Sequence, residues 1–221
     1  GYGDTNIRGD GAGEMGSNLT AIDLGSNILP SFIAAGVNHY CMQTLEGQVK
    51  CWGYNGYGQL GYGDTNDRGD GVGEMGDYLP FVDLGTSCTV VTDLNAGLHH
   101  NCVMCSDGSM KCWGYNFRGQ LGYGDTVTRG DGAGEMGDYL PSVDIAGTSG
   151  LTVVGIFSGS FHNCVLFDDS SMKCWGQNFN GQLGYGDSSD RGDGANEMGD
   201  NLPFVNIGTG RSVLSGCGGQ Y

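Results

Sequence analysis

CWGYNGYGQLGYG at residues 51–63 occurs again as CWGYNFRGQLGYG at 112–124 and as CWGQNFNGQLGYG at 174–186. The copies start about 61 residues apart, and recurrence at a fixed period predicts a repeat architecture in which each copy is one structural unit. Features that every copy shares are therefore interpreted first as structural parts of the repeat. Features that differ between copies are the candidates for a specific function.

The residues around each copy predict strands and turns. In the second copy, the β-branched run 89–94 predicts a strand that ends at 95–97, and 99–105 and 109–113 predict two further strands joined by a tight turn. A long acidic loop follows, and residues 142–145 predict a short strand that leads onward. Because no stretch has helical periodicity, the predicted fold class is all-β.

Cysteine spacing sets the register of the predicted hairpins. If Cys102 faces Cys112, residues 106–108 form a three-residue loop in which Gly108 occupies the place that needs a left-handed backbone. The first copy also has a glycine there, whereas the third has Ser170 and predicts strain or a different turn. The equivalent pairs predict three disulfides that join facing strands, Cys41–Cys51, Cys102–Cys112 and Cys164–Cys174.

Two cysteines lie outside this pattern. If the strand near Cys88 folds back over residues 95–97, Cys88 lies opposite Cys105, which predicts a fourth disulfide. Cys217 is then left over, which predicts an intermolecular bond or a partner in sequence beyond this chain. Disulfides persist in oxidising compartments, so we expect an extracellular protein. A sequon at Asn18 agrees with secretion and predicts a glycan on an exposed loop.

The composition excludes several classes of partner. The formal net charge of −16 and a pI near 4.2 predict a surface that repels phosphate backbones, so nucleic acid is excluded, whereas cations or a basic protein would be attracted. No apolar run approaches the roughly 20 residues that span a bilayer. With no initiator Met or signal peptide, the chain is expected to be a mature product or a part of something longer.

Four ordered motifs resemble the regulator of chromosome condensation repeat family. They are Ala-Gly-x-x-His, the Asp-Gly hairpin, Cys-Trp-Gly-x-Asn and Gly-Gln-Leu-Gly-x-Gly-Asp, and the first is carried by Ala35, Gly36, His39, Ala96, Gly97 and His100. The resemblance implies a β-propeller, in which each blade is a small antiparallel sheet and seven blades commonly close a ring. The cysteine pairs and the long Arg-Gly-Asp loop resemble the extracellular branch of the family. The nucleotide-exchange role of its founding members is not expected in such an acidic, disulfide-bonded chain.

The number of copies predicts an open array. The sequence divides into a partial blade at 1–35, blades at 36–96, 97–158 and 159–217, and the start of another at 218–221, which is about 3.6 units. Uncovered blade edges must be covered by other protein or associate with one another. We therefore expect an array completed by other chains or by further sequence, and self-association into an oligomer or filament.

The acidic loop repeats its carboxylates, which predicts a calcium site as one alternative. The other alternative is that Arg68, Arg129 and Arg191 neutralise and order the same carboxylates within the loop. The arginines belong to Arg-Gly-Asp tripeptides that recur with the repeat, so cell adhesion is the less favoured interpretation of them. The candidate calcium ligands are Asp64, Asp70, Glu74, Asp125, Asp131, Glu135, Asp187, Asp193 and Glu197.

Histidines and aromatic residues also recur. One histidine per copy, His39, His100 or His162, is typical of a buried packing residue, and no nucleophile accompanies it in every copy, so no enzymatic activity and no cofactor apart from calcium is predicted. The tryptophans are expected to pack between neighbouring blades. Loop aromatics are better placed to stack on sugars or to contact a partner, and these are Tyr54, Tyr57, Tyr115 and Phe117.

Three functions follow from these observations. The main hypothesis is a secreted, non-enzymatic structural scaffold that assembles through its open blade edges, such as a subunit of an extracellular fibre or coat. The first alternative is an extracellular module that binds glycans or proteins through its variable loops. The second is a calcium-stabilised adhesion protein.

Overall fold

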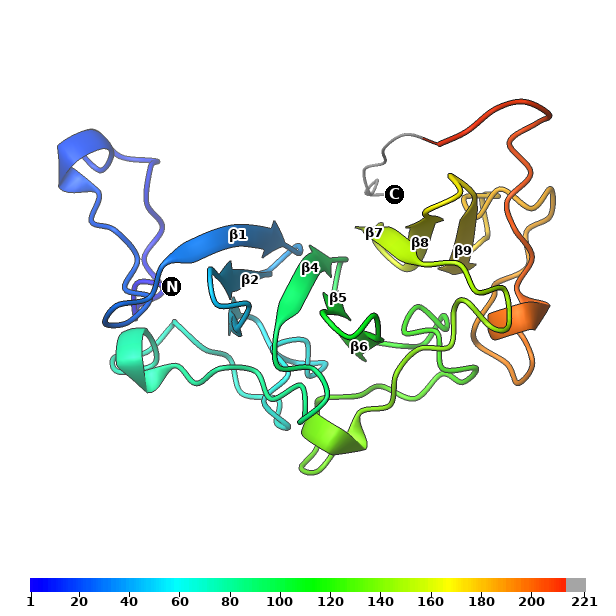
Figure 1. Cartoon of the computed structure of the whole chain (residues 1–221). Helices are drawn as coiled ribbons and strands as arrows, with labels where there is room; N and C mark the ends of the chain where they lie inside the picture. The colour runs from blue at the N-terminus through cyan, green and yellow to red at the C-terminus, as the bar shows by residue number, and fades with distance from the viewer. Residues whose placement is uncertain (214–221) are drawn as a thin grey trace.

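The computed structural model describes residues 1–213 and is built from three three-stranded antiparallel sheets, each one blade (Figure 1). The first blade contains β1 (Pro30–Ala35), β2 (His39–Thr44) and β3 (Val49–Gly53). The second contains β4 (Val91–Ala96), β5 (His100–Cys105) and β6 (Met110–Gly114). The third contains β7 (Val153–Ser158), β8 (His162–Phe167) and β9 (Met172–Gly176).

The blades follow one another along an open arc that does not close into a ring, as Figure 1 shows. Long loops run between them and carry four short 3-10 turns, η1 (Gly16–Asn18), η2 (Gly76–Tyr78), η3 (Gly137–Tyr139) and η4 (Gly199–Asn201). The all-β class and the open propeller are confirmed. The start of a further blade at 218–221 and the leftover Cys217 lie outside the described residues. Within the described part, no helix is long and apolar enough to cross a membrane.

The predicted hairpin register is confirmed in all three blades. Cys41 pairs with Cys51, Cys102 with Cys112 and Cys164 with Cys174 across neighbouring strands, and each pair forms a disulfide. The turns repeat as well, because Gly47 and Gly108 have φ of 80° and 85° and Ser170 has φ of 67°. The third blade therefore keeps the same left-handed turn with a serine in place of glycine.

Three local predictions are corrected. The inner strand of the second blade runs over Val91–Ala96 rather than 89–94, so Asn95 and Ala96 extend it instead of ending it. Val91, not Cys88, faces Cys105 in the ladder, although the Cys88–Cys105 disulfide is present and ties the approach to β4 to the end of β5. Residues 142–145 form no strand, since their backbone bond to β6 is a single one, from Val143 N to Met110 O.

The disulfides of the first and second blades each pack in one core with the tryptophan of the next blade. Cys41 and Cys51 share a core with Trp113, and Cys102 and Cys112 share one with Trp175. The indole N–H of Trp113 donates to the backbone oxygen of Gln59 in the preceding unit, over 3.0 Å. The tryptophans of the second and third blades therefore pack between blades, as predicted.

The junctions also bury the repeated histidines of the first and second blades, His39 and His100. Nε2 of His39 lies 3.1 Å from Oδ1 of Asn101, whose Nδ2 donates to Gln59 O, and His100 pairs in the same way with Asn163. Burial lowers the pKa of both imidazoles to about 4, so they are neutral near pH 7. His39 and His100 are therefore packing residues of the junctions.

Candidate interaction surface

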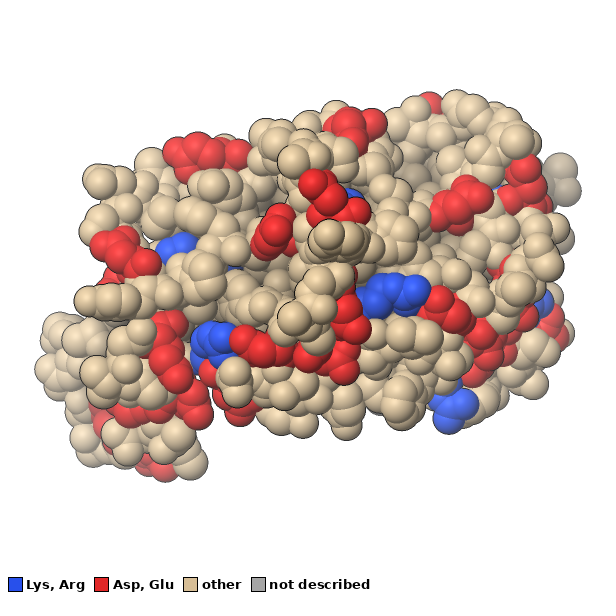
Figure 2. All heavy atoms as spheres, turned by 90° about the horizontal axis from the view of Figure 1, so that it is seen from below, with Lys and Arg blue, Asp and Glu red and all other residues tan. Residues whose placement is uncertain are grey.

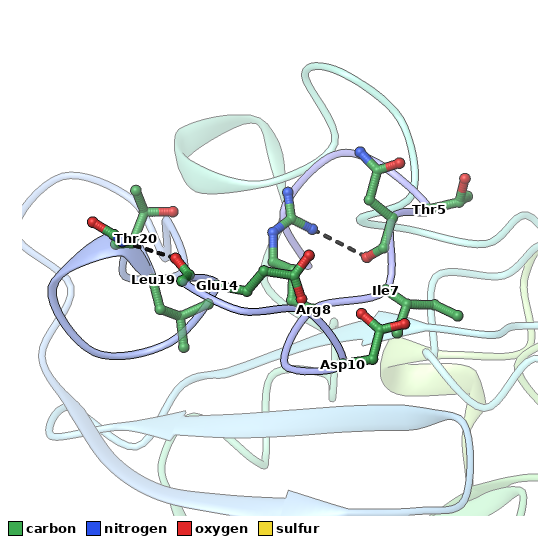
Figure 3. Close-up of a pocket in the computed structure, with 10 residues that line it drawn as sticks. Thr5, Ile7, Arg8, Asp10, Glu14, Leu19 and Thr20 are labelled. Atoms are coloured by element: carbon green, nitrogen blue, oxygen red, sulfur yellow. Dashed lines mark hydrogen bonds between the residues drawn. The ribbon is translucent and has the colours of Figure 1, made fainter.

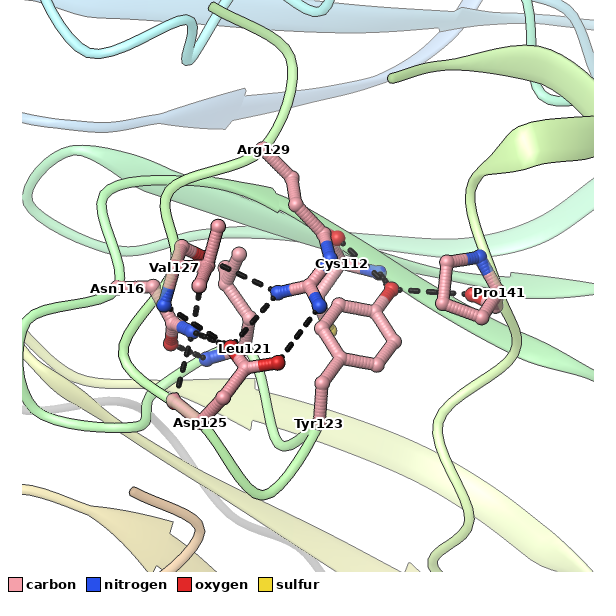
Figure 4. Close-up of polar contacts among 8 residues, drawn as sticks. All are labelled: Cys112, Asn116, Leu121, Tyr123, Asp125, Val127, Arg129 and Pro141. Atoms are coloured by element: carbon pink, nitrogen blue, oxygen red, sulfur yellow. Dashed lines mark hydrogen bonds and ion pairs between the residues drawn. The ribbon is translucent and has the colours of Figure 1, made fainter. Parts of the chain in front are cut away.

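The acidic loop is an internally satisfied structure (Figure 4). The guanidinium of Arg129 donates to both carboxylate oxygens of Asp125, at 3.0 and 2.8 Å, and lies 4.2 Å from the centre of the Tyr123 ring. The side-chain amide of Asn116 donates to the same carboxylate. The hydrogen bond from Arg129 lowers the pKa of Asp125, so the carboxylate stays ionised. The loop therefore has the arrangement of the second sequence-based alternative, in which its arginine neutralises and orders a carboxylate within the loop.

The predicted calcium ligands do not gather in groups of three or more. Among residues 1–213, no three His, Cys, Asp or Glu side chains group so that they could hold a metal ion. Glu135 instead accepts hydrogen bonds from the backbone N–H groups of Gly130 and Gly132, and the equivalent glutamates do the same. The loop carboxylates, which the sequence analysis grouped as one set of candidate ligands, therefore have different partners: Asp125 is bound by Arg129, and Glu135 by backbone N–H groups.

Most basic side chains form ion pairs or hydrogen bonds with other groups of this chain. Arg8, Arg68, Arg129 and Arg191 each pair with the aspartate four residues earlier. Each of the three lysines is buried and donates to two backbone carbonyls, as Lys111 does to Leu84 and Gly137. Figure 2 shows the outcome on one face, where acidic side chains form bands with few basic groups between them. A basic partner is therefore attracted to this molecule and an anionic one is repelled.

The first loop holds an open pocket, which Figure 3 shows beside Arg8, Asp10 and Glu14. Two of its charged groups are already engaged, because Arg8 pairs with Asp4 and Glu14 accepts backbone hydrogen bonds from Gly9 and Gly11. Asn18 lies in the same loop, exposed at the end of η1, and its Nδ2 donates to Gly13 O over 2.8 Å. Glycosylation of Asn18 stays a prediction.

A continuous row of rings crosses the three blades at the end where the inner and middle strands turn. We call this row the aromatic stripe, and it consists of Tyr54, Tyr57, His99, Tyr115, Phe117 and Phe161. Neighbouring ring centres lie 4.8 to 6.1 Å apart, mostly in edge-to-face or tilted contacts. The rings are carried by two kinds of loop, the turns before the middle strands β5 and β8 and the loops after the outer strands β3 and β6.

Backbone hydrogen bonds hold these loops together. Tyr115 N donates to His99 O, and the equivalent bonds are Tyr54 N to Asn38 O and Gln177 N to Phe161 O. Phe117 is 62% exposed and Tyr54 38% exposed, whereas the other members are half-buried. Burial lowers the pKa of His99, so its ring is neutral near pH 7. The stripe is therefore an uncharged aromatic surface on an acidic protein, carried by loops that backbone hydrogen bonds join.

The copies differ at the positions that make the stripe. Positions 54, 115 and 177 are Tyr, Tyr and Gln, and positions 56, 117 and 179 are Gly, Phe and Phe, while the intervening asparagine is constant. The sequence identified Tyr54, Tyr57, Tyr115 and Phe117 as displayed aromatics, and the structure brings them together. It did not identify His99 and Phe161, although variation at the equivalent position 38 was a signal for them.

Comparison with known proteins gives one consistent family. Profiles of the regulator of chromosome condensation (RCC1) repeat match residues 31–59, 91–120 and 153–182, and a second profile of the same repeat matches 107–166. The ultraviolet-B receptor UVR8 of Arabidopsis thaliana is 28% identical over 161 residues, which is 73% of this chain and 32% of the receptor. The probable E3 ubiquitin-protein ligase HERC6 of Homo sapiens is 28% identical over 174 residues, which is 78% of this chain and 15% of the ligase.

Solved structures show the same fold. Yeast RCC1 (Prp20), in its complex with Kap60, superposes with a TM-score of 0.62 at 18% identity and covers 90% of this chain and 42% of that one. Human WBSCR16 superposes with a TM-score of 0.52 at 17% identity and covers 99% of this chain and 63% of that one. The chain spans a third or less of the length of the two curated relatives above.

Proposed function

Because this chain belongs to the regulator of chromosome condensation repeat family, we propose that it is a non-enzymatic propeller module that binds a partner protein through its aromatic stripe. The observation that carries the proposal is the stripe itself, a row of partly exposed rings at positions where the repeats differ. A frame whose repeated parts are internally satisfied leaves these positions free to specify a ligand.

The chemistry of the stripe suits a protein interface. Tyrosine and arginine are enriched among the residues that dominate binding energy, and phenylalanine is enriched in interfaces generally. The rings are already packed against one another, so less side-chain entropy is lost when a partner covers them. Among the structural neighbours, yeast RCC1 is described in complex with Kap60, and Prp20p with binding to Gsp1p and histones, so protein binding is a use to which this fold is put.

Site-specific photocrosslinking tests the proposal. A benzophenone amino acid is placed at Phe117 in the stripe and, as a matched control, at Tyr139, which is 81% exposed on the perimeter. We expect one protein from native material to crosslink from position 117 and not from 139, and to bind the purified chain with an affinity that Phe117→Ala lowers at least fivefold. Equal crosslinking from both positions would contradict the proposal. If the alternative of a glycan ligand holds, a glycan array will give saturable binding that Phe117→Ala removes.

A second candidate is the secreted scaffold that assembles through open blade faces, as a fibre or coat subunit would. The observation in its favour is Ile33, which is 54% exposed, whereas its equivalents Leu94 and Ile156 lie under the preceding blade and are only 0% and 1% exposed. Four disulfides suit the oxidising compartment that secretion implies. It ranks second because the first blade has Tyr40 at the position of Asn101. A second copy docked on the face of Ile33 would therefore lack the histidine–asparagine hydrogen bond that joins neighbouring blades.

Sedimentation tests this second candidate. If the face of Ile33 mediates assembly, the wild type forms oligomers or filaments at micromolar concentration and Ile33→Asp reduces them to 23.1 kDa monomers. Val72→Asp is the matched control, because Val72 is 97% exposed on the perimeter and its charge change is the same. A monomeric wild type at all accessible concentrations would remove the candidate.

A further inference from the structure

A pocket lies on the perimeter of the molecule, where the loops of the first and second blades meet. Its volume is about 580 Å³, within the range of roughly 300–1,000 Å³ in which proteins hold small ligands. The lining includes Tyr62, Phe81 and Asp83 from the first blade and Met136 and Tyr139 from the second. Tyr139 belongs to η3, which lies on the outer side of the arc in Figure 1, and no lining residue belongs to the aromatic stripe.

Contacts across the junction hold the walls of the pocket in place. Gly63 N donates to Gly130 O over 3.1 Å, which joins the two acidic loops. Gly137 N, at the start of η3, donates to Asp83 O over 3.0 Å. The carboxylate of Asp83 also lies against this glycine, because a β-carbon at position 137 would come within 2.7 Å of Oδ2. The Asp83 carboxylate and the turn that carries Tyr139 therefore lie side by side.

The charges around the pocket favour an uncharged ligand. Nζ of Lys50 lies 5.0 Å from the centre of the Phe81 ring, and the guanidinium carbon of Arg68 lies 5.5 Å from the centre of the Tyr62 ring. Because two of the three rings already hold a cation of this chain, a second cation would meet a like charge there. The net charge of −16 repels an anion.

Two groups of the lining are available to such a ligand. Oδ1 of Asp83 accepts from Gly85 N over 2.9 Å, whereas Oδ2 has no hydrogen-bond partner among residues 1–213. The side chain of Tyr139 is 81% exposed. A hydroxyl group can donate to the carboxylate, and polarised C–H groups pack on the negative face of an aromatic ring. A pyranose sugar carries both kinds of group on one molecule.

The two exposed-side rings occur together at one junction only. The equivalent pocket at the preceding junction has Ala21 at the position of Phe81 and Tyr78 at the position of Tyr139. At the following junction these positions are Ser142 and Asn201. The aspartate and the methionine of the pocket are the same at all three junctions. The rings are therefore not required by the repeat, which makes them candidates for a specific function.

We propose that this pocket binds a neutral hexopyranose residue of an oligosaccharide. The apolar face of the sugar packs on Tyr139 and Phe81, and one of its hydroxyl groups donates to Oδ2 of Asp83. This site goes beyond the protein-binding function proposed above and does not depend on it, because the two surfaces share no residue.

Calorimetric titration with defined sugars tests the proposal. The probes are three neutral tetrasaccharides, cellotetraose, maltotetraose and mannotetraose, and the anionic tetragalacturonate. We expect saturable one-to-one binding of at least one neutral probe, and binding of tetragalacturonate at least tenfold weaker. Tyr139→Asn and Phe81→Ser should each weaken the neutral sugar at least tenfold. Both variants carry the residues of the following junction, where Asn201 lies in the same kind of 3-10 turn, so the fold is retained. No saturable binding of any neutral probe would overturn the site.

Matched variants locate the binding at this junction. Tyr78→Asn makes the same change at an equally exposed tyrosine of the preceding junction, which lacks the second ring, and should change binding no more than twofold. The double variant Ser142→Phe with Asn201→Tyr should create a second site, so the stoichiometry should rise from one sugar to two. Equal losses in Tyr139→Asn and Tyr78→Asn, or an unchanged stoichiometry in the double variant, would overturn the assignment.

The stripe is distinguished from this pocket by Phe117→Ala. Sugar binding that this variant removes would place the glycan on the stripe and contradict the pocket. The crosslinking control at position 139 replaces Tyr139 and so removes one ring of the pocket, and it still reports on the stripe alone. Failure of the sugar site and failure of the stripe as a protein interface are therefore separate results.

Discussion

Lowering the pH from 7 to 5 should remove about 4 kcal/mol from the free energy of unfolding, because two buried histidines resist protonation. In the folded chain Nε2 of His39 and of His100 donates to an asparagine oxygen, while Nδ1 of each is buried with no hydrogen-bond partner. Adding a proton to Nδ1 would create a buried charge without an acceptor. In the unfolded chain both imidazoles are free to take up the proton.

The magnitude follows from the two pKa values. Each imidazole has a pKa of about 4 when folded and 6.5 when unfolded, so the unfolded state binds more protons between these values and stability falls as the pH falls. One pKa unit corresponds to about 1.4 kcal/mol. Over roughly 1.5 units, from 6.5 to 5, each ring therefore costs about 2 kcal/mol. The aspartates with lowered pKa, such as Asp125, lose their contribution only below their ordinary value of 3.8, so the two effects occupy separate pH windows.

Urea unfolding at pH 7, 6 and 5, with the disulfides intact, measures the effect. The control is His100→Gln, which cannot titrate and can still donate to Asn163; it should be less stable at pH 7 but lose about 2 kcal/mol less than the wild type between pH 7 and 5. A wild type whose unfolding free energy changes by less than about 1 kcal/mol over this range would refute the reasoning, as would a His100→Gln variant with the full wild-type loss.

Three further predictions concern the frame. Lys111→Met should lower the unfolding free energy by about 2 kcal/mol, because two buried carbonyls lose a charged donor; denaturant titration against Arg211→Met, an exposed basic residue, checks this. Tyr123→Phe should cost about 1 kcal/mol, because its hydroxyl accepts from Cys112 N and donates to the backbone, and no loss on denaturant titration would contradict that role. Millimolar calcium or a chelator should leave the melting temperature unchanged, since arginine and backbone N–H groups already bind Asp125 and Glu135; a rise of several degrees with calcium would support the adhesion hypothesis.

The sequence was sufficient to predict the hairpins of the blades because the same residues recur in every repeat. Cysteine pairs at a constant separation gave the hairpin register, and the structure has Cys102 opposite Cys112 as expected. Boundaries were less predictable, since Asn95 and Ala96 resemble a turn by composition but are held in β4 by pairing with Cys102 and Asn101 of the middle strand. Tertiary pairing overrides local preference at such positions.

The site was only partly predictable, for a related reason. Counting carboxylates in the loop suggested a metal site, but counting does not reveal that Asp125 is bound by Arg129 and Glu135 by backbone N–H groups. Displayed aromatics could be identified, whereas the contact of His99 with Tyr57 could not, because it joins residues in adjacent blades. Differences between equivalent positions were the better guide to the site.

The asparagine that follows each variable position, such as Asn116, has a wider consequence. Its side chain accepts from Leu121 N and donates into the acidic loop, so it anchors the loop whatever ring stands beside it. Single substitutions at the variable positions beside this asparagine can therefore change the binding surface while the fold of the repeat stays the same. A library restricted to positions 38, 54, 56 and 57 and their equivalents would sample new recognition surfaces on an unchanged skeleton, which makes the molecule a natural starting point for engineered binders.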